Sequence, residues 1–70
     1  MNQWLIDLLA KHPDDGNWAK RRRMMYLDRW SSYAVAAAMY DRDVKGDATA
    51  FNAYVADIEA IKAAVPKEVG

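Results

Sequence analysis

The chain has 70 residues, of which 53% are hydrophobic, and ten Lys and Arg residues balance ten Asp and Glu residues. The neutral charge argues against a protein that coats DNA, although it allows a local basic patch. With no cysteine and one histidine, His12, a disulfide framework is excluded and a structural zinc site lacks ligands. Because a domain of this size buries only about 60% of its unfolded surface, we expect one small domain, residues 1–70, that relies on self-association or a partner.

No apolar run approaches the roughly 18 to 20 residues that span a bilayer. The N-terminus also differs from a signal peptide, because Asp7 interrupts its apolar stretch and no basic residue precedes it. We therefore expect no membrane contact. The expected location is the cytoplasm, or a soluble particle assembled there.

Two segments rich in turn-forming residues divide the chain, at residues 12–17 and 45–47. Pro66 ends the regular structure. No strand alternation is visible, so the predicted fold class is all-α, with a short N-terminal helix and a long antiparallel helical hairpin. The predicted helices cover residues of about 2–11, 18–44 and 47–65, followed by a tail at 66–70.

The predicted helix 2–11 places Trp4, Leu5, Leu8 and Leu9 in one apolar stripe. At about three turns it is too short to be stable alone in water. We therefore expect this stripe to dock on the rest of the chain.

The predicted helix 18–44 has an aromatic face that is centred on Trp30 and includes Leu27 and Tyr33. The short connection at 45–47 makes it antiparallel to the helix 47–65, so this face packs on the apolar face of that helix, which includes Tyr54. The predicted core of the hairpin consists of Trp30, Tyr33, Phe51, Val55 and Ile58.

The opposite side of the helix 18–44 carries Met24, Met25, Val35 and Met39. One interpretation is that the helix 2–11 covers part of this side and the remainder is ordinary surface hydrophobicity. The interpretation we favour is an interface with another chain, because methionine is adaptable and is enriched where proteins meet.

Four consecutive cations, Lys20, Arg21, Arg22 and Arg23, lie near the start of the same helix. The helix dipole disfavours cations at this end, so something should offset their charge. A solvated cluster compensated by nearby acids, a docking site for an acidic protein surface, and a phosphate contact all remain open.

The chain lacks the residue patterns of an enzyme. His12 is the only imidazole available to a nucleophilic triad, and no phosphate-binding glycine loop or dinucleotide fingerprint is present. The acids at 41, 43 and 47 lack the spacing of a calcium loop. We therefore expect no catalytic, metal-binding or cofactor-binding residues.

Trp30-Ser31-Ser32-Tyr33, the alanine-rich stretch after it and the late Val65-Pro66 resemble the Trp-x-x-Tyr helix and proline-bearing tail of small bacteriophage tail-assembly proteins. Ala34 stands where those proteins usually carry an arginine. The resemblance implies a virion or assembly component.

Taken together, the sequence predicts a non-catalytic interaction or assembly subunit that binds another protein or copies of itself. The alternative is a small nucleic-acid-binding, regulatory or inhibitory module that uses the cations at 20–23.

Overall fold

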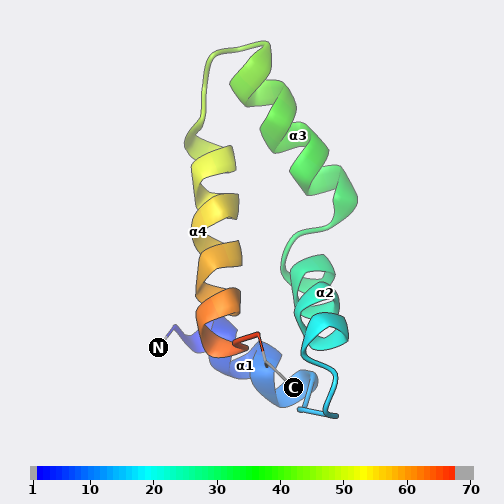
Figure 1. The fold of residues 1–70 in the computed structure, drawn as a ribbon. Helices are drawn as coiled ribbons and strands as arrows, with labels where there is room; N and C mark the ends of the chain where they lie inside the picture. The colour runs from blue at the N-terminus through cyan, green and yellow to red at the C-terminus, as the bar shows by residue number, and fades with distance from the viewer. Residues whose placement is uncertain (1, 68–70) are drawn as a thin grey trace.

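The computed structural model describes residues 2–67, which form four α-helices and no strand (Figure 1). The helices are α1 (Gln3–Lys11), α2 (Trp18–Arg29), α3 (Ser32–Asp43) and α4 (Thr49–Ala64). The predicted all-α class is confirmed for this part of the chain, but the predicted number of three helices is wrong. Residues 68–70, which make up most of the predicted tail, lie outside the described residues.

The predicted helix 18–44 is interrupted at Trp30 and Ser31. Trp30 is extended, with φ −132° and ψ 111°, and Ser31 follows with φ −66° and ψ 159°. The Ser31 hydroxyl accepts a 3.1 Å hydrogen bond from the backbone N–H of Ala34, which is a typical N-cap interaction. α2 and α3 are therefore two helices with different axes, as Figure 1 shows.

The other two connections each turn at a glycine in the left-handed region, Gly16 with φ 87° and Gly46 with φ 71°. Asn17 caps α2, because its side chain accepts a hydrogen bond from a backbone N–H in the first turn. The N-cap residue of α4 is Ala48, and the carboxylate of Asp47 before it accepts a 3.0 Å hydrogen bond from the N–H of Thr49, the first residue of the helix. These loops lie where the sequence predicts them.

α4 packs against both α2 and α3, and α1 crosses α2 at the end of the molecule away from the α3–α4 loop (Figure 1). The main core lies at this end, between α1, α2 and α4. Its buried side chains are Leu5, Leu8, Met25, Ile61 and Val65. On α3, Ala38 is the buried residue.

The structure corrects the predicted core of the hairpin. Tyr33 is 85% exposed and Val55 is 40% exposed, so neither is a core residue, and Trp30, Phe51 and Ile58 are half-buried. The prediction assumed an unbroken helical phase from Trp30 onwards. The two non-helical residues change this phase, so that α3 turns Ala38 inward and Tyr33 outward.

Candidate functional site

An open groove of about 340 Å³ lies where α2 and α3 diverge beside α4. Its lining is mostly apolar and comes from all three helices. The lining residues are Tyr26, Leu27, Trp30, Ser32, Val35, Ala36, Met39 and Tyr54. The groove is a direct consequence of the break at residues 30–31, because a continuous helix would not splay at this position.

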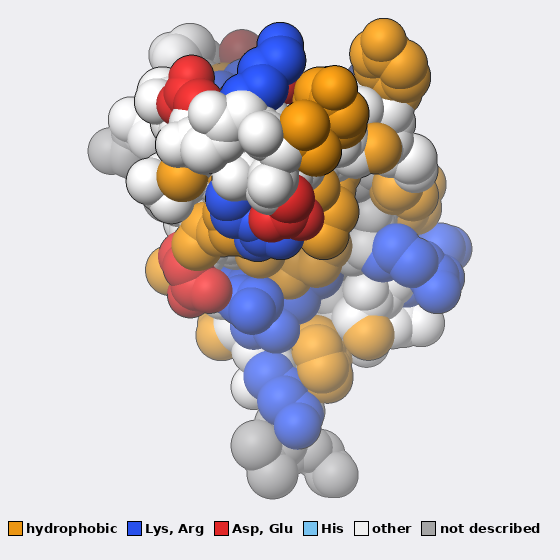
Figure 2. Space-filling model, turned by 90° about the horizontal axis from the view of Figure 1, so that it is seen from above, with side chains coloured by type: hydrophobic (Ala, Val, Ile, Leu, Met, Phe, Trp, Pro, Cys, Tyr) orange, Lys and Arg blue, Asp and Glu red, His pale blue; other side chains and the backbone are white. Residues whose placement is uncertain are grey.

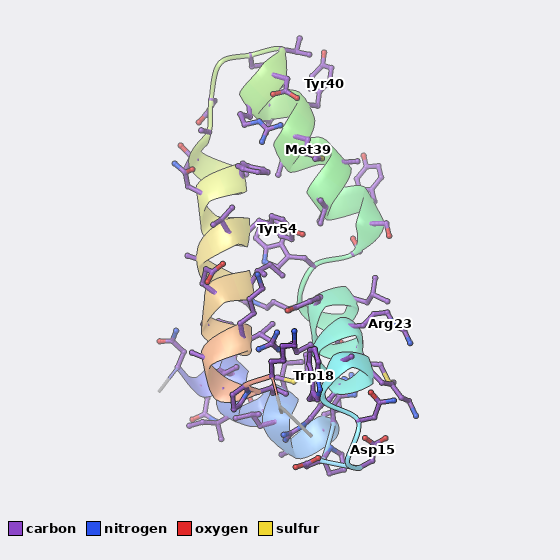
Figure 3. The ribbon with its side chains drawn as sticks, in the orientation of Figure 1. Asp15, Trp18, Arg23, Met39, Tyr40 and Tyr54 are labelled. Carbon is purple, nitrogen blue, oxygen red and sulfur yellow. The ribbon has the colours of Figure 1, made fainter. Side chains whose placement is uncertain are left out.

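The floor of the groove is built from Trp30 and Tyr54, whose rings pack edge to face with centroids 5.5 Å apart. Figure 3 shows Tyr54 extending from α4 towards the junction of α2 and α3. The Trp30 indole Nε1 donates a 2.9 Å hydrogen bond to Oδ2 of Asp57. Arg29 Nε donates to the same oxygen at 3.0 Å, so one carboxylate of α4 fixes both residues at the end of α2.

Large apolar side chains remain exposed on the walls of the groove. Leu27 on α2 is 57% exposed, and Met39 on α3 is 43% exposed. Three more large apolar side chains of this region are exposed: Tyr33 and Tyr40 on α3, and Val44 directly after it. From the end that carries the α3–α4 loop, hydrophobic side chains reach the surface in several places between the charged ones (Figure 2).

The predicted methionine interface does not form one surface. Met25 is fully buried in the core, so the prediction that it meets a partner is wrong for this conformation. Met24 is 43% exposed but lies in a separate hollow beside the loop between α1 and α2. Val35 and Met39 both line the groove, so the structure brings together only these two of the four.

Sequence reasoning missed the α2 and α4 sides of the groove. Leu27 and Tyr54 belong to the aromatic and apolar faces that were predicted to pack on each other. Because the helix is interrupted at residues 30–31, the two faces do not pack on each other along their whole length. Leu27 and Tyr54 line the groove instead. The available signal was the Ser31-Ser32 pair, because serine is a preferred N-cap residue.

Two of the four predicted docking cations serve the fold. Arg21 Nε donates a 2.6 Å hydrogen bond to the backbone oxygen of His12, and its Nη2 donates to that of Leu9 at 3.4 Å. Arg22 Nε donates a 2.6 Å hydrogen bond to the backbone oxygen of Val65. The two arginines thus satisfy carbonyl groups at the C-terminal ends of α1 and α4, where a positive charge also suits the helix dipole.

The other two cations face solvent. Lys20 pairs with Asp15 at 3.5 Å, and both side chains are about half exposed. Arg23 is exposed and makes no ion pair or hydrogen bond with any residue in the described range. It lies one turn before Leu27 on α2 and does not line the groove.

His12 and Lys11 both contact the same carboxylate on α2. Its Nε2 lies 2.9 Å from Oδ2 of Asp28, and Lys11 Nζ lies 2.9 Å from the same atom. Hydrogen bonds from Lys11 and then from His12 lower the pKa of Asp28 below 3.8. The network joins the end of α1 to α2.

Among residues 2–67, no group of three or more acidic, histidine or cysteine side chains is arranged to hold a metal ion. Over the same residues, no helix has the length and apolar character needed to cross a bilayer. No protein-family model, curated protein or solved structure shows a significant match to the chain.

Proposed function

We propose that this chain is a non-catalytic protein-binding subunit whose contact surface is the groove between α2, α3 and α4. The observation that carries the proposal is the exposed apolar lining, above all Leu27 on α2 and Met39 on α3. Burial of such side chains is the main favourable term in protein association. A concave surface with an aromatic floor is also a suitable seat for the apolar face of a helix.

The extended shape of the chain supports a need for a partner. Its radius of gyration is 13.3 Å, whereas about 11 Å is typical of a compact domain of 70 residues. α3 projects away from the main core and contributes only Ala38 to the buried residues. A partner in the groove would cover the side of α3 that the chain itself leaves open.

Protein binding is better supported than the alternative of nucleic-acid binding. A phosphate-binding patch needs several free cations on one surface. Arg21 and Arg22 instead direct their guanidinium groups at backbone carbonyls, which leaves Lys20 and Arg23 as the solvent-facing members of the cluster. An assembly subunit, including one of the phage type suggested by residues 30–33, fits this proposal.

Site-specific photo-cross-linking in cells that produce the chain tests the proposal. A photoreactive residue in place of Met39 should form a discrete covalent adduct with a protein. Ile6 is the matched control, because it is 44% exposed, like Met39 at 43%, but lies on α1 outside the groove. Absence of an adduct at position 39, or equal labelling at position 6, would refute the groove as a binding surface.

A further inference from the structure

We infer that Asp57 on α4 is a positioning residue that holds Trp30 in its extended conformation and so keeps α2 and α3 separate helices. Asp57 does not itself line the groove. It acts through Trp30, which does line the groove and donates a hydrogen bond to Asp57. This role goes beyond the proposed function, because it concerns how the groove is shaped and not what occupies it.

The bend at residues 30–31 leaves backbone hydrogen bonds unmade that a continuous helix would form. Within residues 2–67, the backbone N–H groups of Ser31, Ser32 and Tyr33 donate to no protein acceptor. In an unbroken α-helix, each would donate to the carbonyl group four residues earlier. The segment 18–43 also contains no glycine or proline that would interrupt a helix by itself. Interactions of side chains must therefore stabilise the bend.

Asp57 supplies the stronger of two such interactions. Its Oδ2 atom accepts a hydrogen bond of 2.9 Å from Trp30 Nε1 and one of 3.0 Å from Arg29 Nε. The Asp57 side chain is only 17% exposed, and hydrogen bonds to a charged group are about twice as strong as neutral ones. The other interaction is the cap from the N–H of Ala34 to the Ser31 hydroxyl, which is neutral and exposed.

α4 holds the Trp30 side chain at two points. Tyr54 and Asp57 are three positions apart and thus lie on one face of α4. The Tyr54 ring packs edge to face on the Trp30 ring, while Asp57 accepts the hydrogen bond from its indole N–H. Arg29 is held in turn by α1, because its guanidinium carbon lies 4.3 Å from the centre of the Trp4 ring. The end of α2 is therefore positioned by both α1 and α4.

Backbone NMR tests the role of Asp57. In the parent chain, the Cα secondary chemical shift of Trp30 should have the sign of extended backbone, as its φ of −132° and ψ of 111° require. In Asp57→Ala it should change to the helical sign, and the amide of Ser31 should gain protection from hydrogen exchange. Glu59→Ala is the matched control, because Glu59 is another carboxylate of α4 but pairs with Lys62 of the same helix.

A second variant keeps the test decisive if Asp57→Ala does not fold. Trp30→Phe retains an aromatic ring but removes the indole donor, so residue 30 should become helical even with Asp57 present. Circular dichroism of each variant verifies that the helices persist. With the helices intact, an extended residue 30 in Asp57→Ala or Trp30→Phe would overturn the inference. A helical Trp30 in Glu59→Ala would overturn it equally.

These measurements need no partner, so their outcome is distinct from that of the photo-cross-linking at Met39. If residue 30 becomes helical as expected but position 39 of the parent chain gives no adduct, the role of Asp57 stands and the groove is excluded as a binding surface. If an adduct forms but Trp30 stays extended in folded Asp57→Ala, the binding surface stands and the role of Asp57 is excluded.

Discussion

Arg22 on α2 donates a 2.6 Å hydrogen bond to the backbone oxygen of Val65, a residue 43 positions later in the chain. Its Nη2 also donates to the oxygen of Lys62 at 3.2 Å, so one guanidinium group holds the last turn of α4 against α2. The Arg22 guanidinium carbon lies 5.1 Å from the centre of the Trp18 ring, which adds a cation–π contact.

Arg22→Ala should therefore lower the free energy of unfolding by about 1–3 kcal/mol, the usual range for hydrogen bonds to charged groups. The melting temperature should fall by several degrees. Arg23→Ala is the control, because the neighbouring arginine has no such partner in the described residues and its loss should change stability by less than about 0.5 kcal/mol. Urea unfolding at low protein concentration compares the two, and equal effects would contradict the capping role of Arg22.

Ser31→Ala should destabilise the chain by about 1 kcal/mol, because it removes the hydroxyl that caps α3. Ser31→Asp should retain most of the stability, since aspartate is an equally good N-cap. Ser32→Ala provides the control, because Ser32 is exposed within the first turn of α3 and does not cap it. Thermal unfolding followed by circular dichroism distinguishes the variants. A larger loss in Ser32→Ala than in Ser31→Ala would contradict the observed helix start.

The break at residues 30–31 also marks how far the sequence could predict the fold. The ends of α1 and α4 could be predicted from the sequence, because glycine, proline and Asx residues mark the adjacent loops. The segment around Trp30 has no glycine or proline, and its apolar spacing continues across the break. The extended conformation of Trp30 accompanies a hydrogen bond to Asp57, 27 positions away, and helical spacing alone does not reveal such a tertiary contact.

The candidate site was predictable only in part for the same reason. Val35 and Met39 were recognised as an apolar surface apart from the hairpin core, and both line the groove. Leu27 was assigned to the opposite face, because the helical phase was carried through Trp30 without interruption. Met25 and Met24 are adjacent in the sequence and differ completely in burial, which depends on where α1 docks on α2.

The difference in burial between Met24 and Met25 gives a direct test of the core. Met25→Ala should cost about 2–5 kcal/mol, because Met25 is fully buried among Leu5, Leu8 and Ile61 and its loss leaves a cavity. Met24→Ala should cost less than about 1 kcal/mol, since that side chain is 43% exposed. Urea unfolding of both variants measures the contrast. Similar values for the two methionines would show that the docking of α1 is wrong.

The pairing of Asp28 with Lys11 and His12 makes stability depend on pH in the acid range. Hydrogen bonds from Lys11 and His12 hold the pKa of Asp28 below 3.8 in the folded chain. A carboxyl group with a lowered folded-state pKa stabilises the fold above its unfolded pKa, and this contribution is lost as the pH falls through the folded value. Asp28→Asn should therefore lower the melting temperature at neutral pH and converge on the parent chain at a pH well below 3.8. Asp14→Asn is the comparison for a loop carboxylate, because Asp14 accepts only the local N–H of Gly16. A difference between Asp28→Asn and the parent chain that stayed constant down to that acidic pH would show that the ion pair does not link folding to protonation.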